Sequence, residues 1–494
     1  MEKNCSYAVI DLGSNSFHMM IVQVVAGSVQ IIGRVKRKVR LASGLDENMQ
    51  LSNDAMLRGW ECLNLFAERL QDIPDQNIRI SGTATLRLAK NVSVFLKKAE
   101  QILGHSIQVI SGEQEAQTIY KGVAYTSSSK KKRLVVDIGG ASTELIAGEA
   151  DVPMVYKSLN VGCVTYLEQY FPNGYLSEQN FTNAIAAAEQ EISVIRDLYK
   201  DFDWQEEVGA SGTVQAIQEI LINQGHDEII TLDRLVTIMQ QAITYGTIKN
   251  LNIPGLVKER QLVFPSGLAI LIAIFRQLNL SGMTLAGGAL REGQLYSMLP
   301  QLTKLDVRQR TLNSVMTRYH VDVEHANRVA ELCLDIARQT TPYWDLEQFD
   351  ALEVLRSAAL VHEVGLQVAF KDQQLHASYI LANTNLPGFT EAQKKLLTAL
   401  VRNHREDIDQ PSLAKQTTTS VLLACRLVRL LRLAVILSLR RADEALPEVK
   451  IEIVNEDINL HLPKNWLQSN PLSEAELNQE AAFQAEQGWS LNLK

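Results

Sequence analysis

Cysteine is scarce in this sequence, and its spacing limits the chemistry it can support. The 494 residues include five cysteines, at positions 5, 62, 163, 333 and 425, and no two of them form a Cys-x-x-Cys pair. An odd and widely spaced set is typical of a reducing compartment, because a disulfide framework needs cysteines that can pair. The sequence therefore excludes a disulfide-stabilised secreted domain and offers no cysteine zinc site.

Long apolar runs are missing as well. The stretch at residues 267–275 is apolar but far shorter than the roughly 20 residues needed to cross a bilayer. The N-terminal sequence MEKNCSYAVIDLG passes from polar residues directly into a predicted strand, without the apolar region and cleavage site of a signal peptide. We therefore expect a cytoplasmic protein that has no membrane anchor.

Basic residues do not predominate. Lys and Arg number 48 against 56 Asp and Glu, so the formal net charge of -8 argues against a protein whose whole surface attracts nucleic acid. The charge is uneven, however, because residues 1–150 are net +3 whereas residues 151–300 are net -7. The most basic stretch, residues 31–40, includes Arg34 and Lys36 and no acid. It is either an ordinary solvated face or part of a local anion site.

The apolar residues suffice for buried cores and are arranged in two similar α/β halves. Hydrophobic residues make up 46%, and a chain of this length is expected to form roughly three or four compact units. Residues 7–12 are predicted to form a strand, followed by a hairpin that turns at residues 26–28. A second series of strand, glycine turn and hairpin begins with LVVDIGG at residues 134–140. From about residue 306 the pattern is helical, and residues 450–462 alternate like a two-stranded piece.

A glycine turn follows the first strand of each half. The turns are Asp11-Leu12-Gly13-Ser14-Asn15-Ser16 and Asp137-Ile138-Gly139-Gly140-Ala141-Ser142-Thr143-Glu144. Backbone amides and small hydroxyls at such turns bind phosphate, so two turns facing one cleft would hold a polyphosphate from opposite sides. Asp137 and Glu144, together with Asp11 in the first turn, would supply the carboxylate oxygens that Mg²⁺ prefers. A plain strand-end turn is the alternative for either turn alone.

Two later segments fit the same cleft. They are GASGT at residues 209–213 and AGGALREG at residues 286–293, each between a predicted strand and a predicted helix. Gly212 and Gly288 would let backbone amides approach a ligand, and a helix N-terminus favours an anion. A tight connection without a ligand is the alternative for either segment alone.

Six motifs together resemble the exopolyphosphatase and guanosine pentaphosphate phosphohydrolase family, within the superfamily of actin, sugar kinases and heat-shock ATPases. They are DLGSNSFH at 11–18, SGTATLR at 81–87, ISGEQEA at 110–116, DIGGAST at 137–143, GASGT at 209–213 and LREG at 290–293. The resemblance covers nearly the whole chain and implies an α/β protein with duplicated actin-like (ribonuclease H-like) domains. An all-α HD-like domain and a small α+β C-terminal unit would follow. We place the four parts at residues 1–124, 125–305, 306–447 and 448–494.

The resemblance also implies roles for single residues. Glu115 would be the catalytic base that deprotonates water, and Arg87 would neutralise charge on the transferred phosphoryl group. The spacing of Ser111 and Gln114 independently predicts a capping box, which puts Glu115 in the first turn of a helix, where an acid also suits the helix dipole. The implied phosphate contacts are Gly13, Ser14, Asn15, Ser16, Gly139, Gly140, Ala141, Ser142 and Thr143, and the nucleotide contacts are Gly212, Gly288, Arg260, Arg34 and Lys36. Ala141 departs from the family pattern, which often has a third glycine there, and its methyl group is tolerable if φ is negative.

The helical half resembles a histidine-aspartate phosphohydrolase domain that has lost part of its metal site. His325, His362 and His404 are present, but Glu363 stands at the paired aspartate and Val435 at the late aspartate. We therefore expect a degenerate, noncatalytic domain whose histidines are packed or solvated.

An arginine stripe follows in the same half. Arg426, Arg429 and Arg432 recur every three residues and would line one face of a helix. Such a face would guide a long polyanion, or it would be an ordinary interface or solvated face.

The resemblance implies a Mg²⁺-dependent, homodimeric hydrolase that removes the terminal 5′-phosphate of guanosine pentaphosphate and leaves guanosine tetraphosphate. Release of terminal phosphate from inorganic polyphosphate is the runner-up, because both reactions break a terminal phosphoanhydride and the motifs do not separate them. A nucleotide sensor without turnover is an alternative of another class. A kinase is less favoured, because the sequence reveals no acceptor pocket.

Overall fold

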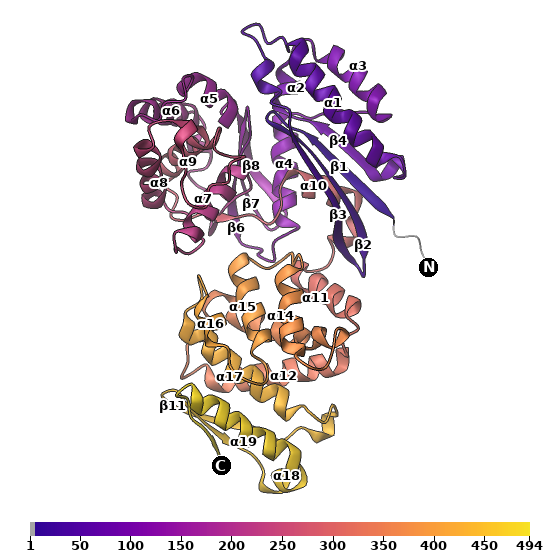
Figure 1. Ribbon diagram of the computed structural model, residues 1–494, viewed down its shortest axis with the longest axis vertical. Helices are drawn as coiled ribbons and strands as arrows, with labels where there is room; N and C mark the ends of the chain where they lie inside the picture. Colours follow the sequence, from indigo (N-terminus) through magenta and orange to yellow (C-terminus); the bar gives the residue numbers. More distant parts are fainter. Residues whose placement is uncertain (1–4) are drawn as a thin grey trace. The chain divides into compact units, whose positions relative to one another are not determined.

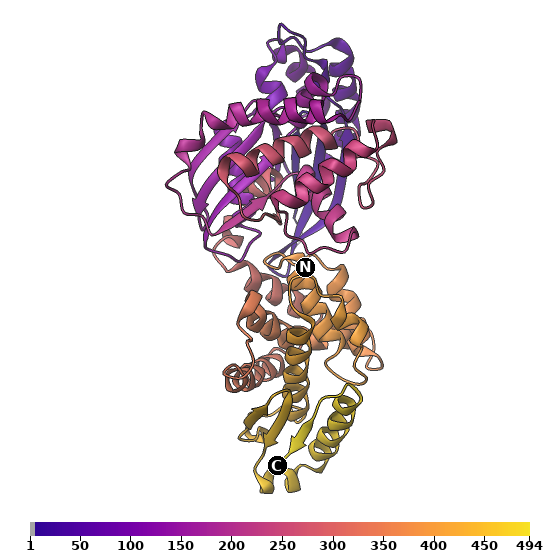
Figure 2. The ribbon, with the colours of Figure 1, turned by 90° about the vertical axis from the view of Figure 1, so that its left-hand side faces the viewer.

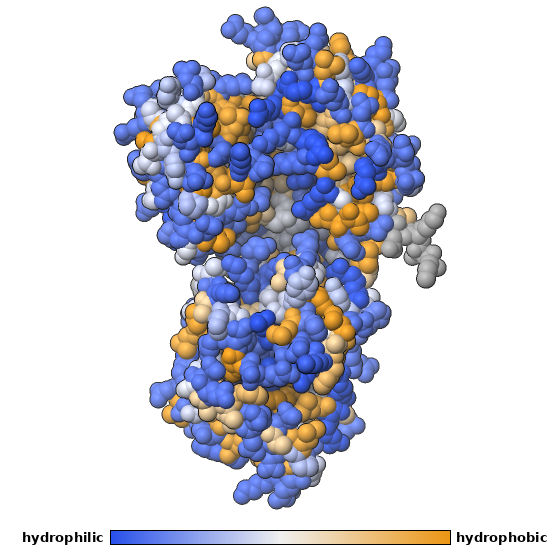
Figure 3. Space-filling view, in the orientation of Figure 1, coloured by the Kyte–Doolittle hydropathy of each residue, from blue (hydrophilic) through white to orange (hydrophobic). Residues whose placement is uncertain are grey.

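The computed structural model describes residues 5–494, and these fall into two compact units. Unit 1 ends at Val307, and unit 2 comprises Arg308–Lys494. No helix within the described residues is long and apolar enough to cross a membrane. On the face drawn in Figure 3, hydrophilic side chains predominate and apolar ones are scattered among them.

The first half of unit 1 is built on a mixed five-stranded sheet (Figure 1). Its strands are β1 (Ser6–Leu12), β2 (Ser16–Val25), β3 (Ser28–Lys38), β4 (Ile78–Gly82) and β5 (Gln108–Val109), in the order β3-β2-β1-β4-β5. The predicted hairpin is confirmed, since β2 and β3 pair antiparallel around Ala26 and Gly27, which both have positive φ. Helices α1 (Asn53–Leu70), α2 (Ala84–Leu88) and α3 (Val92–Leu103) contribute apolar side chains to the same core.

The second half repeats this architecture. Its strands are β6 (Lys132–Ile138), β7 (Thr143–Glu149), β8 (Val152–Leu159), β9 (Glu206–Gly209) and β10 (Thr284–Leu285), in the order β8-β7-β6-β9-β10. In both sheets the first strand of the half is central, with an antiparallel hairpin on one side and parallel strands on the other. The duplicated α/β fold expected from the motifs is therefore confirmed, and β1 and β6 end at equivalent places.

Helices of the second half form the largest apolar core of unit 1. They are α5 (Cys163–Tyr170), α6 (Glu178–Ser193), α7 (Gly212–Asn223), α8 (Leu232–Thr244) and α9 (Phe264–Leu278). Helix α9 is buried all round, because α5, α6, α7 and α8 all contact it. The apolar run at residues 267–275 is thus the interior of a central helix, which explains why it lacks a polar face.

The two halves of unit 1 exchange their last helices. Helix α4 (Gly112–Ala124) follows the first sheet in sequence but packs on β7 and β8, whereas α10 (Leu290–Met298) packs on β1. The two helices also contact each other closely, since a Cβ on Gly122 would lie 1.9 Å from the carbonyl oxygen of Ala289. This exchange holds the helix that carries Glu115 against the second sheet.

Unit 2 begins with a helical bundle. Its helices are α11 (Val307–Arg318), α12 (Val323–Thr340), α13 (Ala351–Val361), α14 (Gln373–Asn383), α15 (Glu391–Arg402), α16 (Gln410–Ala414) and α17 (Val421–Leu437). The helical texture predicted from about residue 306 is confirmed. Side chains of Asp322, Thr390 and Ser420 cap α12, α15 and α17 by accepting backbone N–H groups, which satisfies donors that the helices leave free.

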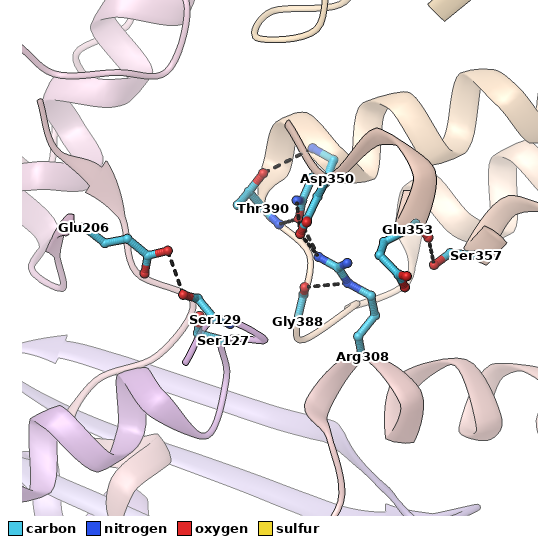
Figure 4. A network of polar contacts seen from close by, with 10 residues as sticks. Ser127, Ser129, Glu206, Arg308, Asp350, Glu353, Ser357, Gly388 and Thr390 are labelled. Carbon is cyan, nitrogen blue, oxygen red and sulfur yellow. Dashed lines mark hydrogen bonds and ion pairs between the residues drawn. The ribbon is translucent and has the colours of Figure 1, made fainter. Parts of the chain in front are cut away.

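Arg308 fastens the start of unit 2 to a later turn, as Figure 4 shows. Its Nε donates to the carbonyl oxygen of Gly388 at 3.2 Å, and its Nη2 lies 3.3 Å from Oδ2 of Asp350. The guanidinium also lies 4.8 Å from the ring centroid of Phe389. These contacts join α11 to the segments that precede α13 and α15.

The C-terminal end of unit 2 holds a three-stranded sheet, where the sequence predicted two strands. Strands β11 (Lys450–Val454) and β12 (Asp457–His461) form the predicted hairpin, and β13 (Leu491–Leu493) adds parallel to β12. Helices α18 (Lys464–Ser469) and α19 (Pro471–Glu486) connect them, and α19 lies beside the sheet (Figure 2). The prediction missed β13 because three residues are too few to show an alternating pattern.

Two of the three arginines in the stripe on α17 are buried rather than exposed at the surface. Arg429 and Arg432 are each 1% exposed, so the expectation of a polyanion guide or solvated face is wrong for both. Arg429 donates to Oε1 of Gln484 at 2.8 Å, and Arg432 donates to both carboxylate oxygens of Glu480 at 2.8 and 2.9 Å. Arg429 and Arg432 therefore face α19, whereas the partly exposed Arg426 pairs with Glu456, so all three charges are satisfied inside unit 2.

Replacement of Arg432 should test this buried pair. Arg432→Met leaves the carboxylate of Glu480 buried without its partner, so we expect a loss of about 3–5 kcal/mol in the free energy of unfolding, measured by urea denaturation. The double variant Arg432→Met, Glu480→Met should recover most of that loss. An unchanged stability of the single variant would contradict the buried pairing.

Candidate active site

A cavity of about 170 Å³ opens in unit 1 between its two halves. Both glycine turns line it, together with α4 and the segments that begin α7 and α10. Of the residues predicted for the site, the lining includes Asp11, Gly13, Ser14, Asn15, Ser16, Lys36, Glu115, Asp137, Gly139, Gly140, Ser142, Glu144, Gly212 and Arg260. Motifs that are far apart in the sequence therefore meet, because β1 and β6 end at equivalent positions of the two sheets.

The two glycine turns approach each other directly. A Cβ on Gly140 would lie 2.9 Å from Cβ of Ser14 and 3.1 Å from the amide nitrogen of Asn15. The first turn is fastened by the segment after β3, since Arg40 N–H donates to the Asn15 carbonyl oxygen at 2.8 Å. Glycine at position 140 therefore allows the two turns to lie this close together, because any side chain there would push them apart.

Ala141 and Thr143 support the second turn without lining the cavity. Ala141 is buried and is not among the residues with positive φ, so its methyl group causes no backbone strain. The hydroxyl of Thr143 donates to the Val161 carbonyl oxygen at 2.6 Å. Of the three residues at 141–143, Ser142 alone lines the cavity.

Carboxylates of both turns converge on one side of the cavity, where Glu144 is buried and Asp11 and Asp137 are half-buried. Burial raises the pKa of Asp11 to about 6 and that of Asp137 to about 7, and the pKa of Glu144 rises well above its usual range. Repulsion adds to desolvation, because Asp11 raises the pKa of Asp137, and Glu115 raises that of Glu144. Oδ1 of Asp11 is buried without a hydrogen-bond partner. Such clustered oxygens fit a hard divalent cation such as Mg²⁺, which would offset their repulsion.

Glu115 lies in the first turn of α4, as the sequence predicts. The capping box is present, since Gln114 N–H donates to Ser111 Oγ at 3.1 Å and the Gln114 side chain accepts from Ser111 N–H at 3.0 Å. Arg87 Nη1 lies 3.0 Å from Oε2 of Glu115 and also donates to the Ile110 carbonyl oxygen at 2.9 Å. Burial raises the pKa of Glu115 to about 7, although the charge and hydrogen bond of Arg87 lower it. Glu115 is therefore poised to exchange a proton near neutral pH.

Cationic side chains line another part of the cavity. Burial and the charges of Arg260 and Arg291 lower the pKa of Lys36 to about 8. Gly212 makes room for Arg260, because a Cβ there would lie 1.7 Å from the guanidinium. Arg34 is exposed and does not line the cavity.

Gly288 is also outside the cavity. A Cβ at this position would lie 2.7 Å from the Gly122 carbonyl oxygen and 2.9 Å from atoms of Thr126. The absence of a side chain at Gly288 therefore allows α4 and the residues after it to pack closely here, and it does not bring the backbone close to a ligand in the cavity.

Sequence reasoning missed four polar residues of the lining. His18, Thr83, Ser211 and Arg291 all face the cavity. Each lies inside a quoted motif, so the signal was present, but spacing alone does not show which motif side chains turn inward. Burial and the charge of Arg291 lower the pKa of His18 to about 2, so this imidazole is neutral.

Comparison of the sequence with known protein families agrees with the fold and the cleft: the chain belongs to the Ppx/GppA phosphatase family. The model of that family matches residues 20–302, and the model of Ppx/GppA phosphatase domain III matches residues 307–481. The resemblance inferred from the motifs is thereby confirmed.

Two curated relatives match nearly the whole chain. Both are named guanosine-5′-triphosphate,3′-diphosphate pyrophosphatase. The protein of Pseudoalteromonas translucida is 54% identical over 98% of this chain and 97% of its own length. The protein of Photobacterium profundum is 51% identical over 99% of this chain and 98% of its own length.

Solved structures show the same fold. An exopolyphosphatase from Cytophaga hutchinsonii has a TM-score of 0.55 and 21% identity, covering 60% of this chain and 98% of that one. The Ppx/GppA family member of Aquifex aeolicus has a TM-score of 0.50 and 22% identity, covering 60% and 99%. At these identities the likeness supports the fold alone.

Proposed function

We propose that this protein hydrolyses the terminal 5′-phosphoanhydride of guanosine pentaphosphate, giving guanosine tetraphosphate and inorganic phosphate. The observation that carries the proposal is the position of Glu115, which is held by Arg87 and faces a cavity lined by both glycine turns. The names of the relatives at about 50% identity favour this substrate.

In the proposed reaction the two turns hold the phosphate chain by backbone amides and hydroxyls, and Glu115 takes a proton from a water molecule. The water oxygen forms a bond to the terminal phosphorus, and the bond from that phosphorus to the bridging oxygen breaks. The bridging oxygen leaves with the guanosine tetraphosphate. Arg87, which pairs with Glu115, would neutralise negative charge on the transferred phosphoryl group.

Asp11, Asp137 and Glu144 are the residues that would hold Mg²⁺. The ion would neutralise phosphate charge and so assist transfer of the phosphoryl group. The burial of Glu144, the unpartnered Oδ1 of Asp11, and the desolvation and Asp11 charge that raise the pKa of Asp137 support this assignment.

Removal of the metal should abolish turnover and lower stability. We expect EDTA to stop phosphate release, and Mg²⁺ at about 100 times its Kd to stabilise the protein by about 2.7 kcal/mol in thermal unfolding. Asp137→Asn should remove most of this stabilisation, whereas Asp72→Asn, at an exposed position, should not. Equal Mg²⁺ stabilisation of Asp137→Asn and the parent would contradict the assignment.

The second phosphate arm of the nucleotide would meet the cationic part of the lining. Arg260 and Lys36 line the cavity and are the better placed candidates for the 3′-diphosphate. Arg34 is exposed, so a role for it would depend on a ligand that extends beyond the cavity. Gly212 contributes indirectly, by making room for Arg260.

Inorganic polyphosphate is the second candidate substrate. The contacts proposed in the cleft involve phosphates, and a solved protein of the same fold carries the name exopolyphosphatase. Phosphate release should be followed with both substrates in competition at matched ionic strength. We expect the larger kcat/KM for guanosine pentaphosphate; a larger value for polyphosphate would reverse the assignment, and binding without release would favour a sensor.

For unit 2 we propose a noncatalytic role as a degenerate HD-like domain. Val435 supplies no metal ligand where an aspartate is expected, and Glu363 replaces the paired aspartate. The homodimer stays a prediction, and sedimentation velocity of the full chain would test it.

A further inference from the structure

A second cluster of ligating side chains lies in unit 2. His325 on α12, together with His362 and Glu363 on the short 3-10 helix η7 (His362–Gln367), offers ligand atoms that lie within 4.8 Å of one another. All three residues are buried. The ring of His404, after α15, lies 5.2 Å from the His362 ring, centroid to centroid. The four residues line a cavity of about 280 Å³ within unit 2.

Hydrogen bonds at Nδ1 fix the ring orientation of two of the imidazoles and leave their Nε2 atoms available to bind a metal. Nδ1 of His362 lies 2.7 Å from the Ala359 carbonyl oxygen, and Nδ1 of His404 lies 2.6 Å from the Val401 carbonyl oxygen. A carbonyl oxygen only accepts, so both Nδ1 atoms carry the proton and both Nε2 atoms keep a free lone pair. Bonds of this kind fix the tautomer and the ring of metal-bound histidines.

Two ring nitrogens in the cluster are buried without a partner. They are Nε2 of His404 and Nδ1 of His325, in side chains that are 1% and 4% exposed. A buried nitrogen that lacks a hydrogen bond is uncommon in folded proteins and calls for an explanation. A metal ion in this cavity would give Nε2 of His404 the partner that the protein does not supply.

We propose that unit 2 binds a divalent first-row transition metal, of the Zn²⁺ type, through His325, His362 and Glu363, with His404 completing the ligand set. Imidazole nitrogens and one carboxylate suit such ions, whereas Mg²⁺ prefers oxygen ligands. Ligand atoms on tetrahedral Zn²⁺ lie about 3.3 Å apart. The ligand atoms of His325, His362 and Glu363 already lie within 4.8 Å of one another, and His404 faces the same cavity. The site joins α12, η7 and the segment after α15, and it stands independently of the reaction proposed for unit 1.

Arg441 competes with the metal for Glu363. Its guanidinium donates to Oε1 of Glu363 and also pairs with Asp322 at 3.3 Å. The side chain of Arg441 is 42% exposed, so it can move into solvent when an ion enters. Removal of this cation should therefore strengthen metal binding rather than weaken it.

The test uses the full chain, stripped with a chelator and titrated with Zn²⁺ by calorimetry and with Co²⁺ by visible absorption. Asp137→Asn serves as the background, because it weakens metal binding by the carboxylates of unit 1. We expect one Zn²⁺ per chain at the cluster, bound about tenfold or more tightly in Arg441→Gln, and Co²⁺ bands typical of nitrogen ligands. His362→Gln should weaken binding at least about 100-fold, whereas His320→Asn, at an exposed residue with positive φ, should not.

The absence of a Zn²⁺ ion at the cluster in both the background protein and Arg441→Gln would overturn the proposal. Since Arg441 is partly exposed, its replacement tests the site even if His362→Gln fails to fold. Equal binding by His362→Gln, His320→Asn and the background protein would overturn it as well.

Discussion

Glu115→Gln should lower kcat for phosphate release by about 10²- to 10⁴-fold while leaving the affinity for guanosine pentaphosphate nearly unchanged. Glutamine keeps the size of the side chain and an oxygen for Arg87, which donates to Oε2 at 3.0 Å, but it does not accept a proton from water. Single-turnover phosphate release gives the chemical step, and equilibrium binding of the nucleotide gives the affinity.

The same turn of α4 offers a matched control. Glu113 lies two residues earlier and is exposed, so Glu113→Gln changes the net charge equally without touching the cavity. We expect Glu113→Gln to keep nearly full activity. Full turnover by Glu115→Gln would show that Glu115 is not the catalytic base.

Arg87→Gln should have the second largest effect, a fall in kcat of about 10²- to 10³-fold, with a changed pH dependence. The charge and hydrogen bond of Arg87 lower the pKa of Glu115, which burial raises to about 7. Their loss raises this pKa further. Because the base acts in its ionised form, the acidic limb of kcat/KM should move to higher pH.

The pH profile separates this role from a merely structural one. A variant that only loosens the fold lowers the rate at every pH and leaves the limb in place. Arg79→Gln, which alters an exposed arginine of β4, should leave both the rate and the limb unchanged. A limb that does not move in Arg87→Gln would contradict the coupling of the two side chains.

The parts of the site that local sequence determines were predictable. The glycine turns follow strongly apolar strands, and the capping box of Ser111 and Gln114 alone is enough to place Glu115 at a helix start. The repetition of strand and turn indicated the duplicated fold, and both turns do line one cavity.

The rest depends on packing between distant segments. Gly288 stands in a glycine-rich turn like the others, yet α4 packs over it because the halves exchange helices. Arg34 lies two residues from Lys36, so both point to the same side of β3, and distance from the cavity rather than orientation separates them. The burial of Arg429 and Arg432 could not be predicted from the sequence either. Their partners, the amide of Gln484 and the carboxylate of Glu480, lie on α19, about 50 residues later in the chain.

The histidines of unit 2 illustrate the same limit. From the sequence they were expected to be packed or solvated, and they are packed, but around a cavity and with ring nitrogens aligned by backbone carbonyl groups. The replaced aspartate positions suggested a lost metal site, whereas His325, His362 and Glu363 bring ligand atoms within 4.8 Å of one another, as the proposed metal site requires.

The central claim is that the cleft of unit 1 removes one phosphate from the 5′ end of guanosine pentaphosphate. Anion-exchange analysis of the nucleotide after incubation with the protein and Mg²⁺, with phosphate measured in parallel, tests it most directly. Guanosine tetraphosphate and inorganic phosphate should appear in equal amounts, and both should be lost in Glu115→Gln. Release of pyrophosphate, loss of the 3′-diphosphate, or an unchanged nucleotide would contradict the proposed function.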